Sequence, residues 1–378
     1  MKFGTRLLHN GHEIDSSTNA VGVPIYQVST YRQESVDRFG RYDYARSDNP
    51  TREALEETIA SLENGERGFA FASGMAAIST TLLLFSAGDH LVVCEDVYGG
   101  AFRVLTKLFP RLGIEATFVD TTNLEAIREA IRPNTRGLYL ETPSNPLLKI
   151  TDLSGAAAIA KERGLITLVD NTFMTPYLQR PLDLGCDIVL HSGTKFLNGH
   201  SDVICGFAVV KDRELGSRIR FLQNAFGAIL GPQDSWLVLR GLKTLRVRME
   251  ESQKSAGAVA EWLSKQERVT EVLYPGLASH PGFAIHQGQA SGPGAVLSFR
   301  LSSVEVTRKL LEEIRLAAFA VSLGGVESIV SYPARMSHAA MSPREREARG
   351  ISDTLVRLSV GLEDTDDLIA DLDRVLNG

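Results

Sequence analysis

Cysteine is scarce in this chain, whose 378 residues include only Cys94, Cys186 and Cys205, with no CxxC pair among them. This scarcity argues against a disulfide-stapled extracellular fold and against a cysteine-based zinc site. The first residues, MKFGTRLLHNGHE, also lack the apolar core and the small residues of a secretory signal. We therefore expect a reduced, cytoplasmic protein.

Neither sign of charge dominates, and no long apolar run is uninterrupted. The 40 basic and 46 acidic side chains give a net charge of −6, so we expect neither nucleic acid nor an anionic membrane as a partner. Residues 68–88 carry no charge, but Ser73, Gly74 and Ser79 interrupt them. We interpret this stretch as a buried strand, a tight turn and a buried helix, not as a membrane span.

Several motifs of common enzyme classes are missing. No GxGxxG follows the first apolar run and no GxxxxGK[ST] occurs, which disfavours dinucleotide and P-loop nucleotide binding. HExxH and GxSxG are absent too, so a zinc protease or a serine hydrolase of those types is not indicated. The histidines are scattered, and we expect no metal site.

The chain contains a repeating alternation of short apolar runs and amphipathic stretches between residues 68 and 210. Strands buried on both faces and separated by helices indicate an open, mostly parallel α/β sheet. One long helical stretch, residues 233–263 with a break near Gly241, then leads into shorter α+β segments. We therefore expect an irregular N-terminal arm (residues 1–48), an α/β domain (49–240) and a smaller α+β domain (241–378).

Ligands of such sheets bind beyond the carboxyl ends of the strands. Polar residues stand at five of the predicted strand ends, namely Glu95-Asp96, Asp120, Glu141-Thr142, Asp170-Asn171 and His191-Ser192.

Two features of the chain, each directly after a predicted strand, suit a phosphorylated carbonyl cofactor. The Ser73–Met75 segment lies where a strand turns into a helix, and the free N–H groups of a helix start bind phosphate. Lys195 follows a strand and is flanked by Ser192 and Thr194. Burial lowers the pKa of a lysine amine and makes it a nucleophile for a carbonyl. An ordinary turn and a lysine that reaches out to solvent are the alternatives.

Two further side chains fit the same hypothesis. Asp170 closes an apolar strand, where a carboxylate can pair with a protonated pyridine nitrogen and keep that ring an electron sink. Tyr98 lies beyond another strand end, where its ring can stack on a flat cofactor. Taken singly, Asp170 is equally an N-cap or turn residue and Tyr98 a packing residue. Their recurrence at the ends of successive strands favours one shared site.

At these residues the chain resembles the Cys/Met-metabolism family of pyridoxal-phosphate (PLP) enzymes, over nearly its whole length. The shared motifs are Tyr42-Asp-Tyr-Ala-Arg-Ser-Asp-Asn-Pro-Thr-Arg, Phe71-Ala-Ser-Gly-Met-Ala-Ala, Asp96-Val-Tyr-Gly-Gly, Glu141-Thr-Pro-Ser-Asn-Pro, Val169-Asp-Asn-Thr-Phe, Ser192-Gly-Thr-Lys-Phe-Leu-Asn-Gly-His-Ser-Asp, Ser322-Leu-Gly-Gly-Val-Glu-Ser and Arg357-Leu-Ser-Val-Gly-Leu-Glu. The resemblance implies fold type I, the aspartate-aminotransferase-like fold, with PLP as the cofactor.

The resemblance also implies roles for individual residues. Lys195 would hold the cofactor covalently and carry the proton, Asp170 would pair with the pyridine nitrogen, and Tyr98 would stack on the ring and act near the substrate amine. Arg357 would clamp the substrate α-carboxylate with two parallel hydrogen bonds, assisted by other residues. The remaining expected contacts are Gly74, Met75, Ser192 and Thr194 for the cofactor phosphate, and Asn145 and Ser322 for the substrate.

The same resemblance gives the N-terminal arm a purpose. In this family Tyr44 and Arg46 would reach the phosphate in the neighbouring subunit, so a lone monomer should be inactive. The expected assembly is a homotetramer, built as a dimer of active dimers.

The reaction implied is carbon–sulfur bond cleavage in transsulfuration. The blocks around residues 23–31 and 331–341 are most similar to bacterial cystathionine β-lyases of the Gram-positive type, which release homocysteine, pyruvate and ammonia from L-cystathionine. Val321 stands where γ-synthases and animal-type γ-lyases often have Glu, and Gly100 stands where methionine γ-lyases typically have Cys. Arg103 would meet the distal carboxylate of the substrate, unless it is a surface arginine.

Three alternatives to β-elimination remain open. They are cystathionine γ-elimination to cysteine and 2-oxobutyrate, the γ-synthase or O-acylhomoserine sulfhydrylase reaction, and a PLP-binding regulator that has lost catalysis. The intact set of Lys195, Asp170, Tyr98 and Arg357 argues against the regulator.

Overall fold

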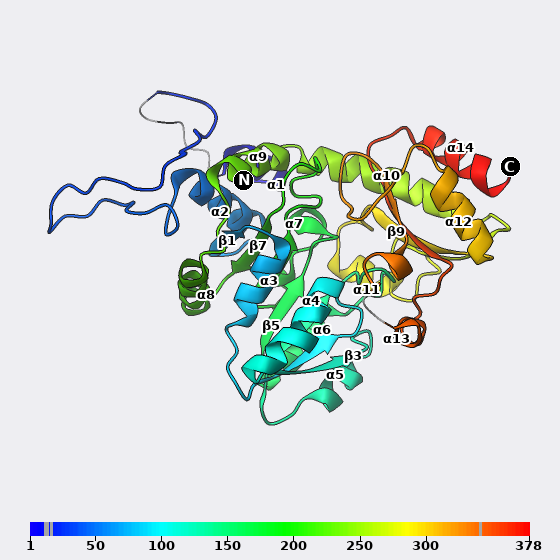
Figure 1. The fold of residues 1–378 in the computed structure, drawn as a ribbon, viewed down its shortest axis with the longest axis horizontal. Helices are drawn as coiled ribbons and strands as arrows, with labels where there is room; N and C mark the ends of the chain where they lie inside the picture. The colour runs from blue at the N-terminus through cyan, green and yellow to red at the C-terminus, as the bar shows by residue number, and fades with distance from the viewer. Residues whose placement is uncertain (11–14, 16–17, 340–341) are drawn as a thin grey trace.

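The computed structural model describes residues 1–10, 15, 18–339 and 342–378, and two β-sheets organise it (Figure 1). The larger sheet has the strand order β1-β7-β6-β5-β4-β2-β3, and β7 is the one strand of this sheet that runs opposite to the others. The mostly parallel α/β sheet predicted from the sequence is confirmed. Its strands are β1 (Arg67–Phe71), β2 (His90–Cys94), β3 (Glu115–Val119), β4 (Thr135–Glu141), β5 (Ile166–Asp170), β6 (Ile188–Ser192) and β7 (Gly206–Val210).

Helices cover both faces of this sheet, so its central strands are buried on both sides. Helix α2 shows how the sequence sets a helix start. Asn49 accepts hydrogen bonds from the N–H groups of Thr51 and Arg52, and Pro50 occupies the first helical position. The other helices of this part are α3 (Gly74–Leu82), α4 (Gly99–Arg103), α5 (Leu124–Ala130), α6 (Leu153–Glu162), α7 (Thr175–Leu178) and α8 (Arg213–Phe226), with the short helices η1 (Val104–Leu108), η2 (Phe109–Leu112) and η3 (Pro181–Leu184); α2 itself spans Pro50–Leu62.

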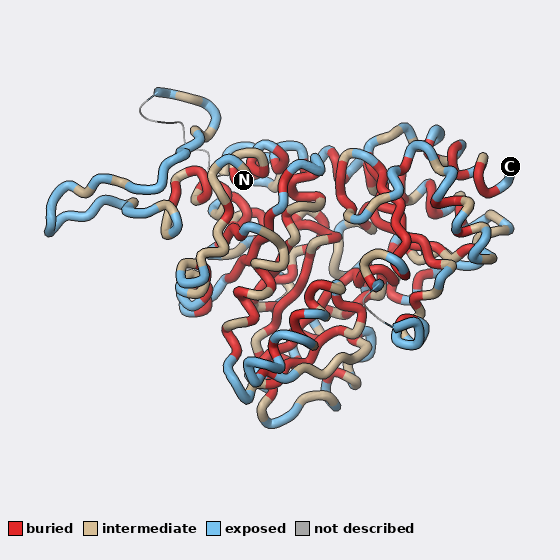
Figure 2. The backbone as a smooth tube through the Cα atoms, viewed as in Figure 1, coloured by how far each residue is buried: buried red, intermediate tan, exposed pale blue. Residues whose placement is uncertain are grey.

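The second sheet is smaller and has the order β10-β11-β12-β9-β8, with antiparallel pairing except between β10 and β11. Helices α10 (Leu245–Leu263), α12 and α14 pack on it and enclose a separate apolar core (Figure 2). Its strands are β8 (Val269–Leu273), β9 (Val296–Leu301), β10 (Ala318–Phe319), β11 (Ile329–Ser331) and β12 (Leu355–Ser359), and its helices are α11 (Phe283–Gln289), α12 (Val304–Glu313), η4 (Pro333–Arg335), α13 (Pro343–Ala348) and α14 (Thr365–Leu376).

Helix α9 (Pro232–Leu242) and the long helix α10 (Leu245–Leu263) lead from the larger sheet to the smaller one (Figure 1). The helical stretch predicted over 233–263 is therefore present. Its break lies at Lys243 and Thr244, just after the expected position at Gly241. The division of the chain at residues 48 and 240 stays a prediction.

The N-terminal arm departs from its predicted irregularity at one place, because helix α1 (Phe3–His9) buries Leu7 beside α2. The rest of the described arm extends away from the body (Figure 1). Two of its runs lie side by side, with the Tyr31 N–H donating to the Asp43 carbonyl at 2.9 Å. Most side chains from 20 to 45 are exposed.

No helix in the described residues has the length and apolar character needed to cross a membrane. Nor do the described His, Cys, Asp and Glu side chains gather in a group of three or more that could hold a metal ion.

Candidate active site

A cavity of about 540 Å³ lies between the two sheets, at the carboxyl ends of β4, β5 and β6. Ser331 of β11 and Arg357 of β12 line it from the side of the smaller sheet. The cavity therefore stands where a parallel α/β sheet binds its ligands. It gathers most of the site residues expected from the sequence, namely Gly74, Met75, Tyr98, Arg103, Asn145, Asp170, Ser192, Thr194, Lys195, Ser322 and Arg357.

Lys195 projects into this cavity from the turn that follows β6. The Lys195 amide donates to the Ser192 carbonyl at 3.2 Å, which closes the turn. The Nζ atom donates a 2.6 Å hydrogen bond to the Ser322 hydroxyl. Burial, with a further contribution from the nearby Arg357, lowers the pKa of Lys195 to about 8. The amine is thus available as a nucleophile or base close to neutral pH.

Asp170 lies at the end of β5 and is only 7% exposed. Its Oδ1 accepts hydrogen bonds from the amide and the hydroxyl of Thr172, while Oδ2 accepts none from the described residues. Burial raises the pKa of Asp170, and the Thr172 hydrogen bonds and the nearby His191 act in the opposite direction. A carboxylate that lines the cavity and has one oxygen without a hydrogen-bond partner can accept a hydrogen bond from a protonated ring nitrogen.

Tyr98 caps the start of α4, and its ring is partly exposed in the cavity. Its amide donates to Oε2 of Glu141 at 2.8 Å, which ties the α4 start to the end of β4. Burial, together with the neighbouring Asp170, raises the pKa of Glu141 well above its usual range. Glu141 was predicted to stand at a strand end but was given no role there.

Arg357 is buried in β12 and reaches across to the larger sheet. One guanidinium nitrogen donates to Oδ1 of Asn145 at 2.8 Å and another to the carbonyl of Ser322 at 2.7 Å. Burial lowers the pKa of Arg357 to about 10, so the group stays cationic at neutral pH. Ser322 has a backbone φ of +88°, a strained value for a residue other than glycine. This conformation presents its hydroxyl to Lys195 and its carbonyl to Arg357.

Arg103, at the end of α4, lines the cavity but is itself exposed. In the described part of the chain its guanidinium has no ion pair and no hydrogen bond. Ile204 and Val321, which also line the cavity, are 67% and 66% exposed. The cavity mouth thus combines apolar side chains with an unpaired positive charge.

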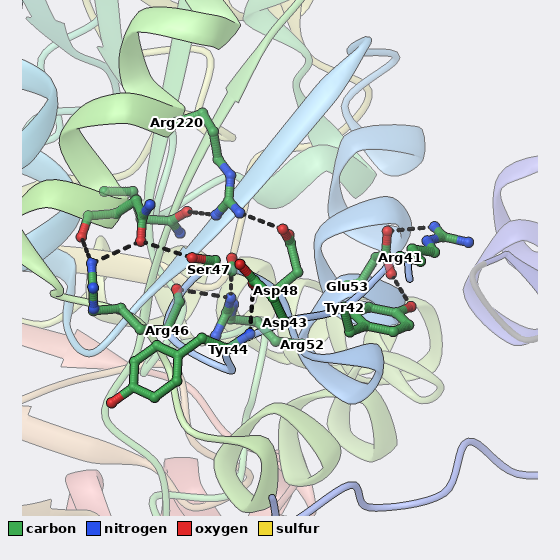
Figure 3. A network of polar contacts seen from close by, with 12 residues as sticks. Arg41, Tyr42, Asp43, Tyr44, Arg46, Ser47, Asp48, Arg52, Glu53 and Arg220 are labelled. Atoms are coloured by element: carbon green, nitrogen blue, oxygen red, sulfur yellow. Dashed lines mark hydrogen bonds and ion pairs between the residues drawn. The ribbon is translucent and has the colours of Figure 1, made fainter. Parts of the chain in front are cut away.

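Tyr44 and Arg46 do not reach the cavity of their own chain. Arg46 instead turns toward α8, where it donates to the side-chain oxygen of Asn224 at 2.9 Å (Figure 3). The Tyr44 side chain is 46% exposed, and its ring projects from the network drawn in Figure 3. Both residues belong to the end of the arm, ahead of α2.

A family model described as "Cys/Met metabolism PLP-dependent enzyme" matches residues 4–377. The chain belongs to this family. The resemblance inferred from its motifs is confirmed, and the cofactor is pyridoxal phosphate.

Similar proteins of this PLP-dependent family include lyases of two kinds. The chain is 60% identical over 372 residues to cystathionine beta-lyase MetC of Bacillus subtilis, covering 98% of this chain and 95% of that protein. It is 52% identical over 377 residues to a cystathionine gamma-lyase of the same organism, covering 100% and 99%. The crystal structure of cystathionine gamma-lyase from Lactobacillus plantarum complexed with L-serine has a TM-score of 0.98 at 48% identity, covering 100% of this chain and 99% of that one.

The residues of the cavity fit PLP. The Lys195 amine, with its lowered pKa, suits a bond to the aldehyde carbon, and the open oxygen of Asp170 suits a pyridinium N–H. The start of α3 offers unsatisfied backbone N–H groups for a phosphate. Gly74 is needed there, because a Cβ at this position would approach Ser192 Cβ to 3.0 Å.

The sequence assigned no specific role to several wall residues of this PLP-dependent enzyme. Glu141, Thr172, Met336 and Ser337 all line the cavity. Thr172 follows Asp170 by two positions, so the strand-end signal that found Asp170 could have included it. Met336 and Ser337 come from the loop after β11, and no local pattern places that loop opposite the larger sheet.

Proposed function

We propose that the protein is a PLP-dependent carbon–sulfur lyase that cleaves L-cystathionine by β-elimination. The bond from the β-carbon to sulfur breaks, and with one water the products are homocysteine, pyruvate and ammonia. One observation supports lyase chemistry most directly: a buried amine of lowered pKa and a buried guanidinium meet at Ser322 in one cavity. The 60% identity to a cystathionine beta-lyase supports the choice of reaction.

In this proposal Lys195 is the base. Its Nζ, with a pKa lowered to about 8, takes the proton from the α-carbon of the substrate. PLP, when bound, supplies the electron sink that makes this carbon acidic. The hydrogen bond from Nζ to the Ser322 hydroxyl holds the amine in the cavity, and Tyr98 is the second catalytic residue, close to the substrate amine.

The cofactor is held from two sides. Asp170 pairs with the pyridine nitrogen, and the Tyr98 ring stacks on the cofactor. The phosphate binds the backbone of Gly74 and Met75 and the hydroxyls of Ser192 and Thr194. The Thr194 hydroxyl accepts from the Cys205 amide at 2.9 Å. Its single O–H, which donates to the Cys205 carbonyl at 3.2 Å, turns to the phosphate when the cofactor binds.

The substrate is held at both of its ends. Arg357 binds the α-carboxylate with two N–H groups, a geometry that lysine cannot reproduce, and Asn145 and Ser322 orient this guanidinium. Arg103 at the mouth binds the distal carboxylate. The apolar side chains of Val321 and Ile204, which line the same cavity, suit the thioether.

The active unit is a pair of chains. Tyr44 and Arg46 of one copy complete the phosphate site of the other, which accounts for their distance from the cavity of their own chain. Val21, Val36 and Phe39 on the arm are 85%, 88% and 69% exposed, and exposed apolar side chains on one segment mark a contact surface. Two such pairs form a homotetramer, and scattering mass measurement should give four times 41.2 kDa.

We also place the protein in the cytoplasm. Cys94, Cys186 and Cys205 are all buried and free, as expected in a reducing compartment. Fractionation of the producing cell tests this assignment.

A γ-lyase is the second candidate, because a cystathionine gamma-lyase is 52% identical to this chain. That reaction needs a second proton removal, at the β-carbon. Val321 supplies no carboxylate at the cavity mouth for it. At Gly100 a Cβ would come within 2.5 Å of Tyr98 Cε1 and 2.6 Å of Met75 Sδ, so the Cys of a methionine γ-lyase would fit there only if these side chains moved.

Product analysis with L-cystathionine decides between these reactions. Pyruvate and homocysteine establish β-elimination. 2-Oxobutyrate and cysteine establish γ-elimination and overturn the proposal. If neither pair forms, the γ-synthase and sulfhydrylase reactions are tested with O-acylhomoserine plus cysteine or sulfide.

A further inference from the structure

A buried charged pair lies directly behind the cavity wall. Nε2 of His191 and Oε1 of Glu63 are 2.6 Å apart, and both side chains are 0% exposed. Glu63 caps the end of α2, whereas His191 belongs to β6. Neither residue lines the cavity, and no role was assigned to either of them above.

The pair connects the ends of adjacent strands. Oε1 of Glu63 also accepts from the Asn171 amide group at 3.1 Å. Asn171 in turn exchanges hydrogen bonds with Gln179, whose side chain donates to the Thr142 carbonyl at 3.1 Å. One continuous network therefore joins α2 to the carboxyl ends of β4, β5 and β6.

Each strand-end member of this network is the sequence neighbour of a cavity residue. Thr142 follows Glu141, Asn171 follows Asp170, and His191 precedes Ser192. Successive side chains of a strand point to opposite faces. Glu141, Asp170 and Ser192 thus line the cavity. Their neighbours join the network behind it, Asn171 and His191 through their side chains and Thr142 through its carbonyl.

Several carboxyl groups are buried in this region, and His191 lies among them. Asp96, Glu141 and Asp170 are all buried near one another. Among the described residues, His191 is the only cationic partner that Glu63 contacts within ion-pair distance, and a fully buried carboxylate without a counter-charge is costly. His191 also acts on Asp170, since it opposes the rise in the pKa of Asp170 that burial causes.

We propose that Glu63 and His191 are positioning residues that fix the ends of β5 and β6 and, through the charge on His191, favour the ionised form of Asp170 toward the cofactor. Glu63 holds the His191 ring in place through the 2.6 Å contact between Oε1 and Nε2. The relay of hydrogen bonds from Asp170 through the Thr172 hydroxyl to the Ser192 amide, the last of them 2.9 Å long, couples the two strand ends at the cavity itself. The inference rests on the proposed pairing of Asp170 with the pyridine nitrogen.

The test measures PLP affinity, by titrating cofactor-free protein with PLP and following the visible absorbance. Glu63→Gln keeps the shape and an acceptor oxygen for Asn171 but removes the charge. We expect PLP to bind about tenfold more weakly to this variant. His191→Asn repeats the measurement from the other side of the pair, and covers the case in which Glu63→Gln does not fold.

A double-mutant cycle separates this role from general structural damage. In an Asp170→Asn background the charge of His191 has no carboxylate to act on, so Glu63→Gln should change PLP affinity less than about twofold. His90→Asn is the matched control. His90 is also fully buried in the same sheet, hydrogen-bonded to Thr135 and Thr117, but at the opposite ends of the strands. The His90→Asn substitution should lower thermal stability and leave PLP affinity unchanged.

The outcomes are distinguishable. Equal losses of affinity from Glu63→Gln in the native and the Asp170→Asn backgrounds would show a purely structural pair and overturn the inference. Unchanged affinity in Glu63→Gln and His191→Asn would overturn it too, while leaving the role of Asp170 intact. If Asp170→Asn itself binds PLP as tightly as the native protein, the proposed role of Asp170 fails, and the inference fails with it.

Discussion

Lys195 and Ser322 are 127 positions apart in the chain, yet the lysine Nζ donates a 2.6 Å hydrogen bond to the serine hydroxyl. Lys195 lies in the turn after β6 of the larger sheet, and Ser322 lies in the loop between β10 and β11 of the smaller sheet. The Ser322 carbonyl also accepts a hydrogen bond from Arg357. One strained residue therefore orients both the proposed base and the proposed carboxylate-binding arginine.

Lys195→Ala should abolish turnover and the visible absorbance that belongs to the bond between the lysine and the cofactor. The amine is both the attachment point and the base, and no other lysine lines the cavity among the described residues. Absorbance spectra and pyruvate release are the measurements. Lys254→Ala, at an exposed site on α10, is the control and should retain both signals. Native activity in Lys195→Ala would disprove the mechanism.

Capture of PLP by the cofactor-free protein should depend on pH with a break near 8. Burial and Arg357 lower the pKa of Lys195 to about 8, and only the neutral amine attacks a carbonyl. Below this pH the capture rate should rise about tenfold per pH unit, and above it the rate should level off.

Dividing the capture rate by that of Nα-acetyl-lysine at each pH cancels the ionisations of PLP itself. The ratio should be flat below pH 8 and fall between about 8 and 10, because only the free lysine continues to gain neutral amine. A ratio that stays flat to pH 10 would mean that Lys195 has an ordinary pKa.

Arg357→Ala should weaken substrate capture by ~2–5 kcal/mol, the cost of leaving a buried charge without its partner. Steady-state kinetics with L-cystathionine should show a fall in kcat/KM carried mostly by KM. Arg357→Lys should recover only part of the loss, since an ammonium cannot make two parallel hydrogen bonds. Unchanged kcat/KM in Arg357→Ala would place the carboxylate elsewhere.

Arg103→Ala should discriminate between substrates. Its guanidinium at the cavity mouth is unpaired within the described chain, so KM for L-cystathionine should rise several-fold, on the order of 1 kcal/mol for an exposed ion pair. KM for S-methyl-L-cysteine, which has no distal carboxylate, should stay the same. Arg111→Ala, in η2 outside the cavity, controls for the loss of a surface charge. Equal effects on both substrates would contradict the assignment.

Mixing two inactive variants should restore activity if the arm completes a second copy's site. Lys195→Ala lacks the base, whereas Arg46→Ala lacks the phosphate contact offered to the other chain. Hybrid dimers contain one site with both residues intact, so co-refolded mixtures should gain activity that neither variant has alone. Kinetic assay of the mixture against each variant measures the gain. No gain would show that Arg46 serves its own chain or has no role.

Part of the fold and of the site could be predicted because the signals are local. Apolar runs ended by Asp170, Glu141 and Ser192 identified the strand ends, and parallel strands place those ends at one edge. The segment 99–112 was harder to predict. It consists of α4, the π-helical η1 and the 3₁₀-helical η2, because packing against the sheet, not periodicity, sets its turn geometry.

The sequence by itself determined the parallel sheet, the location of the site at its edge, the family and the identity of most site residues, because periodicity and short motifs are properties of neighbouring residues. Only the tertiary structure decided which distant groups meet. The contact of Lys195 and Arg357 with Ser322, the burial that lowers the pKa of the Lys195 amine, and the pairing of Glu63 with His191 all depend on segments more than 30 positions apart. Burial and charge proximity arise when the chain closes on itself, and no local pattern encodes them.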